Sequence, residues 1–303
     1  FGSRNHRGAF VVRPCFRRAS RCAMVHFAGA CVLRAVRAPI NAVSASLGFA
    51  AALTSSTTYS TVRISDEVHG VEAVAPGAQR TRVILYFHGG GHWLLNVHTY
   101  REFIGRLSAE TNARVVAVAY RKPPDVQFPA GLEDAMKAWR WALEQCPASA
   151  VAVAGDSSGG NLAFALMVKL AQLEEPQPAA CIGISPWLNL NRPQWTGAWG
   201  KLCVELYLGG KRKVTAASDP LVSPVNMQPE LLQRCAPVLM HAGRNELTTE
   251  DVKAMQAAFE REGIFTEVQL YGAPHIFQVG PGFWNSTKDS LSRISAFLER
   301  HWS

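Results

Sequence analysis

From Val83 onward, short apolar runs alternate with segments whose apolar residues recur at helical spacing. The apolar runs lack polar alternation, which is typical of strands buried on both faces of a parallel sheet. The strands expected from these runs are Val83–His88, Val115–Ala119, Val151–Ala154, Ala180–Ser185, Val238–His241 and Val268–Tyr271. The expected helices are Thr99–Thr111, Gly131–Gln145, Asn161–Leu173, Glu250–Glu262 and Thr287–His301. This alternation predicts an α/β fold with a mostly parallel central sheet flanked by helices.

The alternation is interrupted between Asn189 and Arg234, where Trp195, Trp199 and Tyr207 occur. An insertion between successive strands of such a sheet lies over the strand ends where ligands bind. We therefore expect a helical cap at about residues 189–235.

The charge distribution separates an N-terminal segment from the rest of the chain. The net charge is +8, yet residues 1–65 hold nine of the 31 basic residues, all arginine, and no acid. The remaining 22 basic residues face 23 acids, so residues 66–303 are close to neutral. A nucleic-acid-binding domain carries its basic footprint on the folded part, so no nucleic-acid partner is expected. The division predicts a basic segment at 1–65 and a catalytic domain at 66–303.

The N-terminal segment is rich in arginine, serine and alanine, a composition typical of organelle targeting. Its apolar stretch Ala38–Leu53 is shorter than the ~20 residues of a membrane-spanning helix. We therefore expect a helix packed over the catalytic domain, with membrane association as the less favoured alternative. The seven cysteines fit no zinc pattern and indicate reduced thiols, which favours an intracellular location, cytoplasmic or organellar.

A candidate nucleophile lies in Gly155–Gly159, which reads Gly-Asp-Ser-Ser-Gly and matches G-x-S-x-G. The motif follows one expected strand directly and runs into a helix. A sharp turn of this kind lifts the serine hydroxyl above the sheet, and the flanking glycines let strand and helix approach. The context favours Ser157 as a nucleophile over an ordinary glycine-rich turn.

A second glycine motif, His88–Gly91, follows the expected strand at Val83. Consecutive glycines let the backbone turn so that N–H groups point outward. Such donors stabilise the negative charge that develops on an ester carbonyl oxygen under attack. Alone the motif is also consistent with a simple tight turn, and its pairing with the serine motif favours an oxyanion hole.

Together these motifs resemble the hormone-sensitive-lipase-like family of α/β-hydrolases, from about Val83 to Phe277. Further segments that carry the resemblance are Tyr120–Pro124, Phe128–Ala135, Ser185–Trp187, Asp219–Pro224 and Gly272–His275. The resemblance implies that the N–H groups of Gly90, Gly91 and Ser158 form the oxyanion hole. It also implies that His88 and Asp156 support their loops, and that the cap includes part of the N-terminal segment.

The expected base is a histidine late in the chain, because this fold orders its triad as serine, acid and histidine. His275 follows an expected strand directly, whereas His301 lies in the terminal helix among charged neighbours. The acid is expected after the strand at Val238. Glu246 takes the acid position of one branch of the family, and Asp251 is its rival, although an acid there also suits the first turn of a helix.

These residues predict a serine carboxylesterase that acts through Ser157, His275 and Glu246 and needs no metal or organic cofactor. The expected substrate is a small ester with a short acyl group, since aromatic side chains of the cap predict an enclosed pocket. An amidase or deacetylase with the same triad is the first alternative. A non-catalytic ligand-binding protein is the second, because fold alone does not fix function.

Overall fold

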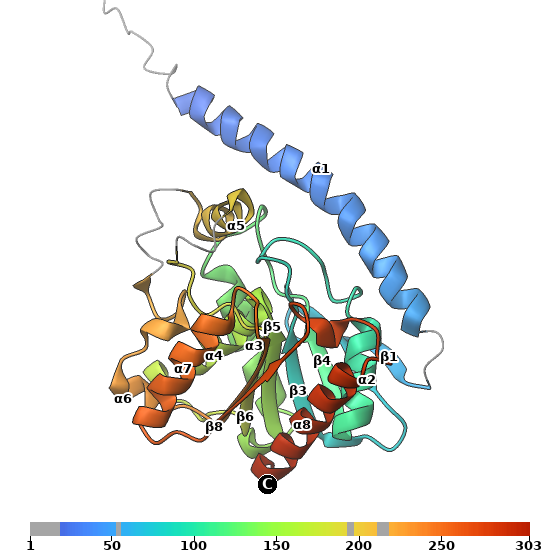
Figure 1. Ribbon diagram of the computed structural model, residues 1–303. Helices are drawn as coiled ribbons and strands as arrows, with labels where there is room; N and C mark the ends of the chain where they lie inside the picture. Colours follow the sequence, from blue (N-terminus) through green and yellow to red (C-terminus); the bar gives the residue numbers. More distant parts are fainter. Residues whose placement is uncertain (1–18, 53–55, 193–196, 211–217) are drawn as a thin grey trace, which may run out of the picture.

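A computed structural model describes residues 19–52, 56–192, 197–210 and 218–303. Its strands form one eight-stranded sheet in the order β1-β2-β4-β3-β5-β6-β7-β8. β2 runs antiparallel to both of its neighbours, and the pairs from β4 to β8 are parallel (Figure 1). The strands are β1 (Thr58–Arg63), β2 (His69–Val74), β3 (Gln79–Phe87), β4 (Ala113–Val118), β5 (Val151–Asp156), β6 (Ala180–Ile184), β7 (Val238–Gly243) and β8 (Thr266–Tyr271). The predicted mostly parallel α/β sheet is confirmed.

Helices cover both faces of this sheet, because its inner strands are apolar on both sides. One face packs against α2 (Arg101–Thr111) and α8 (Asn285–His301). The other packs against α3 (Ala130–Leu143), α4 (Ser158–Leu173) and α7 (Thr249–Arg261). Shorter elements are η1 (Ala148–Ala150), η4 (Pro224–Asn226), α6 (Pro229–Leu232) and η5 (Phe277–Val279).

The strands and helices expected from Val83 onward all occur, with ends shifted by a few residues. The hairpin of β1 and β2 was not predicted. β1 reads Thr-Tyr-Ser-Thr-Val-Arg and is exposed along most of its length, so it carries no clear apolar run. Since the hairpin starts at Thr58, the sheet begins before the division expected at residue 66.

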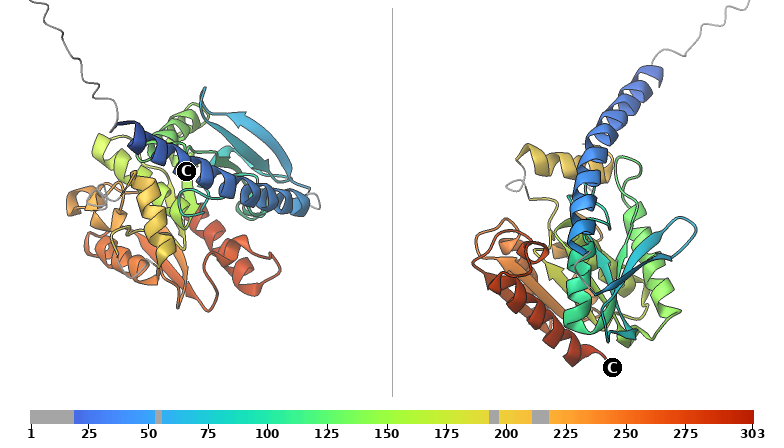
Figure 2. Two further views of the ribbon diagram at one scale, coloured as in Figure 1. Left: turned by 90° about the horizontal axis from the view of Figure 1, so that it is seen from above. Right: turned by 90° about the vertical axis from the view of Figure 1, so that its right-hand side faces the viewer.

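A long helix, α1 (Ala19–Ala52), crosses one end of the molecule beside α5 (Ala198–Leu208) (Figures 1 and 2). Several polar contacts tie α1 to the catalytic domain. Arg37 donates to Pro123 O at 2.6 Å, Arg34 pairs with Asp125 at 2.8 Å, and the hydroxyls of Ser44 and Thr99 lie 3.0 Å apart. Among the described residues, no helix is long and apolar enough to cross a bilayer.

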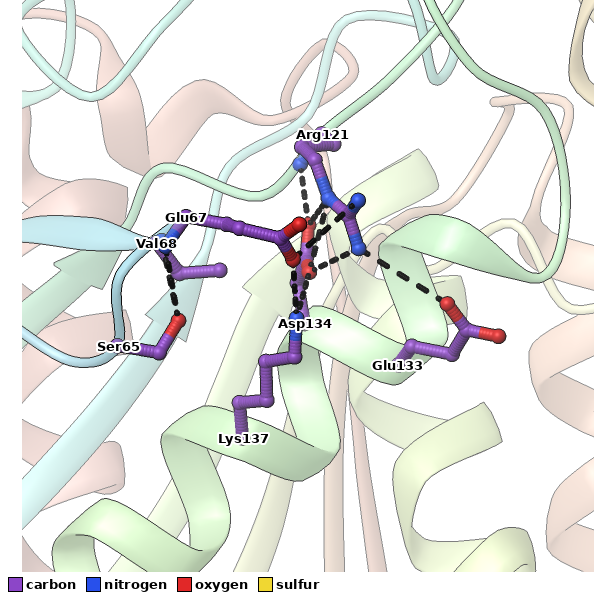
Figure 3. Close-up of polar contacts among 7 residues, drawn as sticks. All are labelled: Ser65, Glu67, Val68, Arg121, Glu133, Asp134 and Lys137. Atoms are coloured by element: carbon purple, nitrogen blue, oxygen red, sulfur yellow. Dashed lines mark hydrogen bonds and ion pairs between the residues drawn. The ribbon is translucent and has the colours of Figure 1, made fainter.

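A polar network fixes the segment that follows β4 (Figure 3). The backbone N–H and the guanidinium of Arg121 both donate to the buried carboxylate of Asp134 on α3. Lys137, one turn further along α3, donates to Glu67 at 2.6 Å. The next residue before Arg121, Tyr120, donates its hydroxyl to His88 O at 2.7 Å. The segment therefore supports the glycine loop after β3.

Candidate active site

The serine motif forms a tight turn between β5 and α4. Ser157 has φ 51° and ψ −118°, a backbone conformation that non-glycine residues rarely adopt. A Cβ atom at Gly155 would collide with Gly159 O, and one at Gly159 would collide with Phe87 O. The flanking glycines are therefore required by the close approach of β5, α4 and β3. The turn leaves Ser157 partly exposed at the carboxyl edge of the sheet.

Two further predicted residues lie beside this serine. His275 Nε2 is 3.1 Å from Ser157 Oγ, and His275 Nδ1 is 2.9 Å from Glu246 Oε2. His275 follows β8 and Glu246 follows β7, so neighbouring parallel strands bring all three to one edge of the sheet. His275 is 41% exposed, whereas Glu246 is 6% exposed.

The environment of Glu246 favours its ionised form. Burial alone would raise its pKa, but hydrogen bonds with His275 and from Thr248 hold the pKa of this carboxyl below its usual value. Its Oε1 also accepts the Gly243 N–H at 3.0 Å. The geometry suits an imidazole that donates from Nδ1 to Glu246 and accepts the serine proton at Nε2.

Asp251 lies elsewhere, in the first turn of α7. Its carboxylate is buried and faces Arg192 at 3.4 Å. Burial raises the pKa of Asp251 to about 7, although Arg192 and the Asn189 backbone oppose the shift. Among the contacts of the described residues, His275 pairs with Glu246 and not with Asp251.

The glycine loop after β3 turns close to the serine. Gly90 and Gly91 have φ of 115° and 63°, and a Cβ at Gly91 would come within 2.6 Å of Cys203 Sγ. Within the described part of the chain, the N–H groups of Gly90 and Gly91 donate to no other backbone atom. Ser158 begins α4 immediately after the serine, so its N–H belongs to the free amide groups of a helix start.

Asp156 links the serine turn to this glycine loop. Its fully buried carboxylate accepts hydrogen bonds from the Tyr86 hydroxyl at 2.6 Å, the Tyr100 hydroxyl at 2.8 Å and the Gly89 N–H at 2.9 Å. Burial nevertheless keeps the pKa of Asp156 above its usual value. The contacts match the supporting role that the family resemblance implies for this residue.

His88 receives support on two sides. Its Nδ1 hydrogen-bonds Gly89 O at 2.7 Å, and Lys122 Nζ lies 3.0 Å from its Nε2. Lys122 also donates to Leu95 O, beyond the glycines. Burial lowers the pKa of Lys122 to about 7. The sequence analysis included this lysine only within the segment Tyr120–Pro124 and gave it no role, whereas in the structure it bridges the two ends of the glycine loop.

The cap contributes an apolar cluster above the site. It joins residues of the glycine loop and of α5, and Leu33 of α1 packs at its margin. The buried members of this cap cluster are Trp93, Trp187, Leu190, Cys203, Val204, Tyr207, Leu208 and Val222. His92 stacks on Tyr207 with ring centroids 3.8 Å apart, and Trp93 contacts Trp199. Burial lowers the pKa of His92 to about 3, so this imidazole stays neutral. Trp195, expected in the same wall, lies outside the described residues.

Ser185 is a site residue that sequence reasoning noticed only as part of the family resemblance. It follows β6, has φ 47° and is completely buried. Its Oγ accepts the Ile276 N–H at 3.1 Å and hydrogen-bonds Glu246. Ser185 thus connects the loop of the histidine to the acid. Its position after an inner strand of the sheet was the signal that could have found it.

The described residues show neither a metal-binding cluster nor a disulfide. They contain no group of three or more histidine, cysteine or acidic side chains placed to bind a metal. The described cysteines, Cys31, Cys146, Cys181, Cys203 and Cys235, are free thiols. The side chains of Cys15 and Cys22 lie outside the described part.

Comparisons with known proteins identify the family of the chain. Residues 84–279 match the α/β-hydrolase fold family. An acetyl-hydrolase of Streptomyces hygroscopicus is 34% identical over 221 residues, which cover 69% of this chain and 71% of that protein.

Solved structures extend the match. A crystal structure of an esterase from the bacterial hormone-sensitive lipase family has a TM-score of 0.74 and 28% identity, covering 82% of this chain and 85% of that one. The esterase EstE5, soaked with p-nitrophenyl butyrate, has a TM-score of 0.74 and 25% identity, covering 84% of this chain and 90% of the other.

The fold and these matches define the class as α/β-hydrolases that cleave carboxylic esters. Within it, the chain belongs to the hormone-sensitive-lipase-like esterase family. The resemblance inferred from the glycine and serine motifs is thereby confirmed.

Proposed function

We propose that this carboxylic ester hydrolase acts through a triad of Ser157, His275 and Glu246 and cleaves esters of short acyl groups. The observation that carries the proposal is the continuous chain from Ser157 Oγ to His275 Nε2, at 3.1 Å, and from His275 Nδ1 to Glu246, at 2.9 Å. In this order the imidazole can accept the serine proton while the carboxylate stabilises the resulting positive charge.

The reaction proceeds by acyl transfer. Ser157 Oγ attacks the ester carbonyl carbon as its proton passes to His275 Nε2, and the carbonyl oxygen becomes an oxyanion. The N–H groups of Gly90, Gly91 and Ser158 receive that charge; each such donor typically contributes ~10²–10³ in rate. The C–O bond then breaks, the alcohol leaves with the proton from His275, and water hydrolyses the acyl-enzyme by the same steps.

Glu246 is favoured over Asp251 as the acid by both charge and contact. The pKa of Glu246 is held low by its partners, so the carboxylate is ionised wherever His275 works as a base. Asp251, with a pKa of about 7, is partly protonated at neutral pH and is directed at Arg192.

The short-acyl proposal rests on the buried aromatic rings of the cap. Trp93 and Tyr207 are buried in the cap cluster and His92 is buried against Tyr207, and we expect these rings to limit the length of the acyl chain. Each methylene buried in such a pocket gains ~0.8 kcal/mol until the wall is reached. In support, one similar protein is named an acetyl-hydrolase, and one similar structure is that of an esterase soaked with p-nitrophenyl butyrate.

Two experiments test these proposals. Ser157→Ala should lower kcat by roughly 10⁶ while circular dichroism shows a folded protein, and a fluorophosphonate probe should label only Ser157 in the parent protein. Substantial activity in folded Ser157→Ala would exclude the triad. A series of p-nitrophenyl esters, run beside aryl amides, should give the highest kcat/KM between acetyl and about hexanoyl; preference for emulsified long-chain lipids or for amides would contradict the short-ester assignment.

A further inference from the structure

The outer surface of α1 carries an apolar stripe that nothing in the described chain covers. Its five large aliphatic side chains recur every three or four residues and are 41–68% exposed. They are Val32, Val36, Ile40, Val43 and Leu47. Residues three or four apart share one helix face, so these side chains form a continuous ridge, which Ala35, Pro39 and Ala42 widen.

The opposite margin of α1 already has its partners. Leu33 packs against the cap cluster, and Arg37 and Ser44 hydrogen-bond the catalytic domain. The exposed stripe is therefore not the surface with which α1 binds its own domain. A contiguous exposed apolar surface of this kind marks a site of interaction with a protein or a membrane.

The N-terminal segment that includes α1 is basic in its sequence. Residues 1–37 contain eight arginines and no acid, and no acid occurs before Asp66. Beside the C-terminal part of α1 lies a cavity of about 460 Å³, lined by Ala45, Ser46, His98 and Arg101. The nearest acid, Asp125, is already paired with Arg34 and Arg37. An anionic surface fits this combination of apolar ridge and positive charge.

We propose that the exposed stripe of α1 docks onto the surface of an anionic lipid bilayer, with the helix lying in the interface. The stripe would enter the boundary between headgroups and acyl chains, and the positive charge of the N-terminal segment would be attracted to the anionic headgroups. Because Leu33 joins α1 to the cap cluster, docking holds the active-site end of the molecule near the membrane. The proposal goes beyond ester hydrolysis and does not require the triad assignment.

A second copy of the chain fits the stripe less well. Two copies joined through α1 would each bring an arginine-rich segment without acids to pair with the other. An anionic bilayer supplies the opposite charge as well as the apolar medium.

The test uses the full chain and sedimentation with vesicles of phosphatidylcholine, with and without phosphatidylserine. The variant Val36→Gln/Ile40→Gln/Val43→Gln removes the middle of the stripe and keeps good helix formers. Leu173→Gln/Phe283→Gln is the matched control, because it removes exposed apolar side chains elsewhere. Ser157→Ala serves as a catalytically silent version of the parent protein.

The parent protein, the control and Ser157→Ala should bind the phosphatidylserine vesicles, and added salt should weaken binding. The stripe variant should bind at least about tenfold more weakly, because three aliphatic side chains no longer enter the bilayer. Its hydrolysis of a dissolved p-nitrophenyl ester should be unchanged.

Three outcomes would overturn the proposal. The parent protein could fail to bind either vesicle, or the stripe variant could bind like the parent. Lipid-free ultracentrifugation could also reveal a dimer that the stripe variant dissociates, which would assign the stripe to a second copy.

Discussion

The two halves of the active site are held in place by different means. On the side of the nucleophile, β5, α4 and β3 approach so closely that Gly155 and Gly159 have no room for a side chain. On the side of the base, His275 is 41% exposed and is positioned by side-chain hydrogen bonds through Glu246 and Ser185. Backbone packing therefore fixes the proposed nucleophile, whereas polar contacts between loops fix the proposed base. Substitutions on the side of the nucleophile should consequently lower both stability and activity, whereas those on the side of the base should lower mainly activity.

After loss of the nucleophile itself, the largest effect is expected from Glu246→Gln, which removes the charge facing His275. We expect kcat to fall by ~10³–10⁴, because an uncharged partner no longer stabilises the imidazolium or selects its tautomer. The melting temperature should change little. Steady-state kinetics and thermal unfolding measure both quantities.

Asp251→Asn is the matched comparison, and it should lower kcat by less than about tenfold. The Asp251 carboxyl is directed at Arg192, not at His275. Because its pKa is about 7, this carboxyl is already partly uncharged at neutral pH, and a neutral asparagine changes the charge of the site little. A larger loss at Asp251 than at Glu246 would transfer the acid role to Asp251.

On the nucleophile side, Gly159→Ala should lower both activity and stability. The new Cβ would meet Phe87 O, a backbone atom that cannot move without shifting β3. We expect about 3 kcal/mol of destabilisation and at least ~10² lower kcat, since displacement by one ångström is enough for that loss. Gly197→Ala is the control and should behave like the parent, because no atom of the described residues lies within 4 Å of the added Cβ. Unchanged stability in Gly159→Ala would contradict the packing argument.

Ser185→Ala tests whether the orientation of His275 and Glu246, and not only their charges, contributes to activity. The substitution removes the hydroxyl that joins Glu246 to the Ile276 N–H and leaves the charges of the site intact. We expect kcat to fall by about tenfold with KM nearly unchanged, because a misplaced base affects the transition state more than substrate binding. Ser185→Thr, which keeps the hydroxyl, should recover part of the loss. If KM rises and kcat stays constant, Ser185 contacts substrate rather than positions the base.

The same contrast explains what the sequence could reveal. Strands buried on both faces and the serine and glycine motifs are local patterns, so the sheet from β3 to β8 and the position of Ser157 were predictable. The contacts of Glu246 with His275, and of Lys122 with His88, join residues far apart in sequence that only the folded sheet brings together. The sequence therefore favoured Glu246 only through the family resemblance and kept Asp251 as its rival. The β1–β2 hairpin escaped prediction because an exposed edge strand needs no apolar run.

The smallest expected effect concerns Lys122, the half-buried amine that hydrogen-bonds both ends of the glycine loop. Burial, with a further contribution from the Arg37 charge, lowers its pKa in the folded protein to about 7, against ~10.4 in an unfolded chain. Between these values the unfolded state binds more protons than the folded state, so the contribution of Lys122 to folding stability rises with pH. Below about pH 6 both states are protonated, and this dependence vanishes. We therefore expect the free energy of unfolding of the parent, measured against Lys122→Met by denaturant titration, to increase by up to ~1.4 kcal/mol per pH unit from pH 7 to 9. Lys122→Met should also lower kcat modestly, because Leu95 O and His88 lose the donor that joins them. If the free energies of unfolding of the two proteins instead change equally with pH across that range, Lys122 keeps its proton in the folded state and stays charged beside the glycine loop.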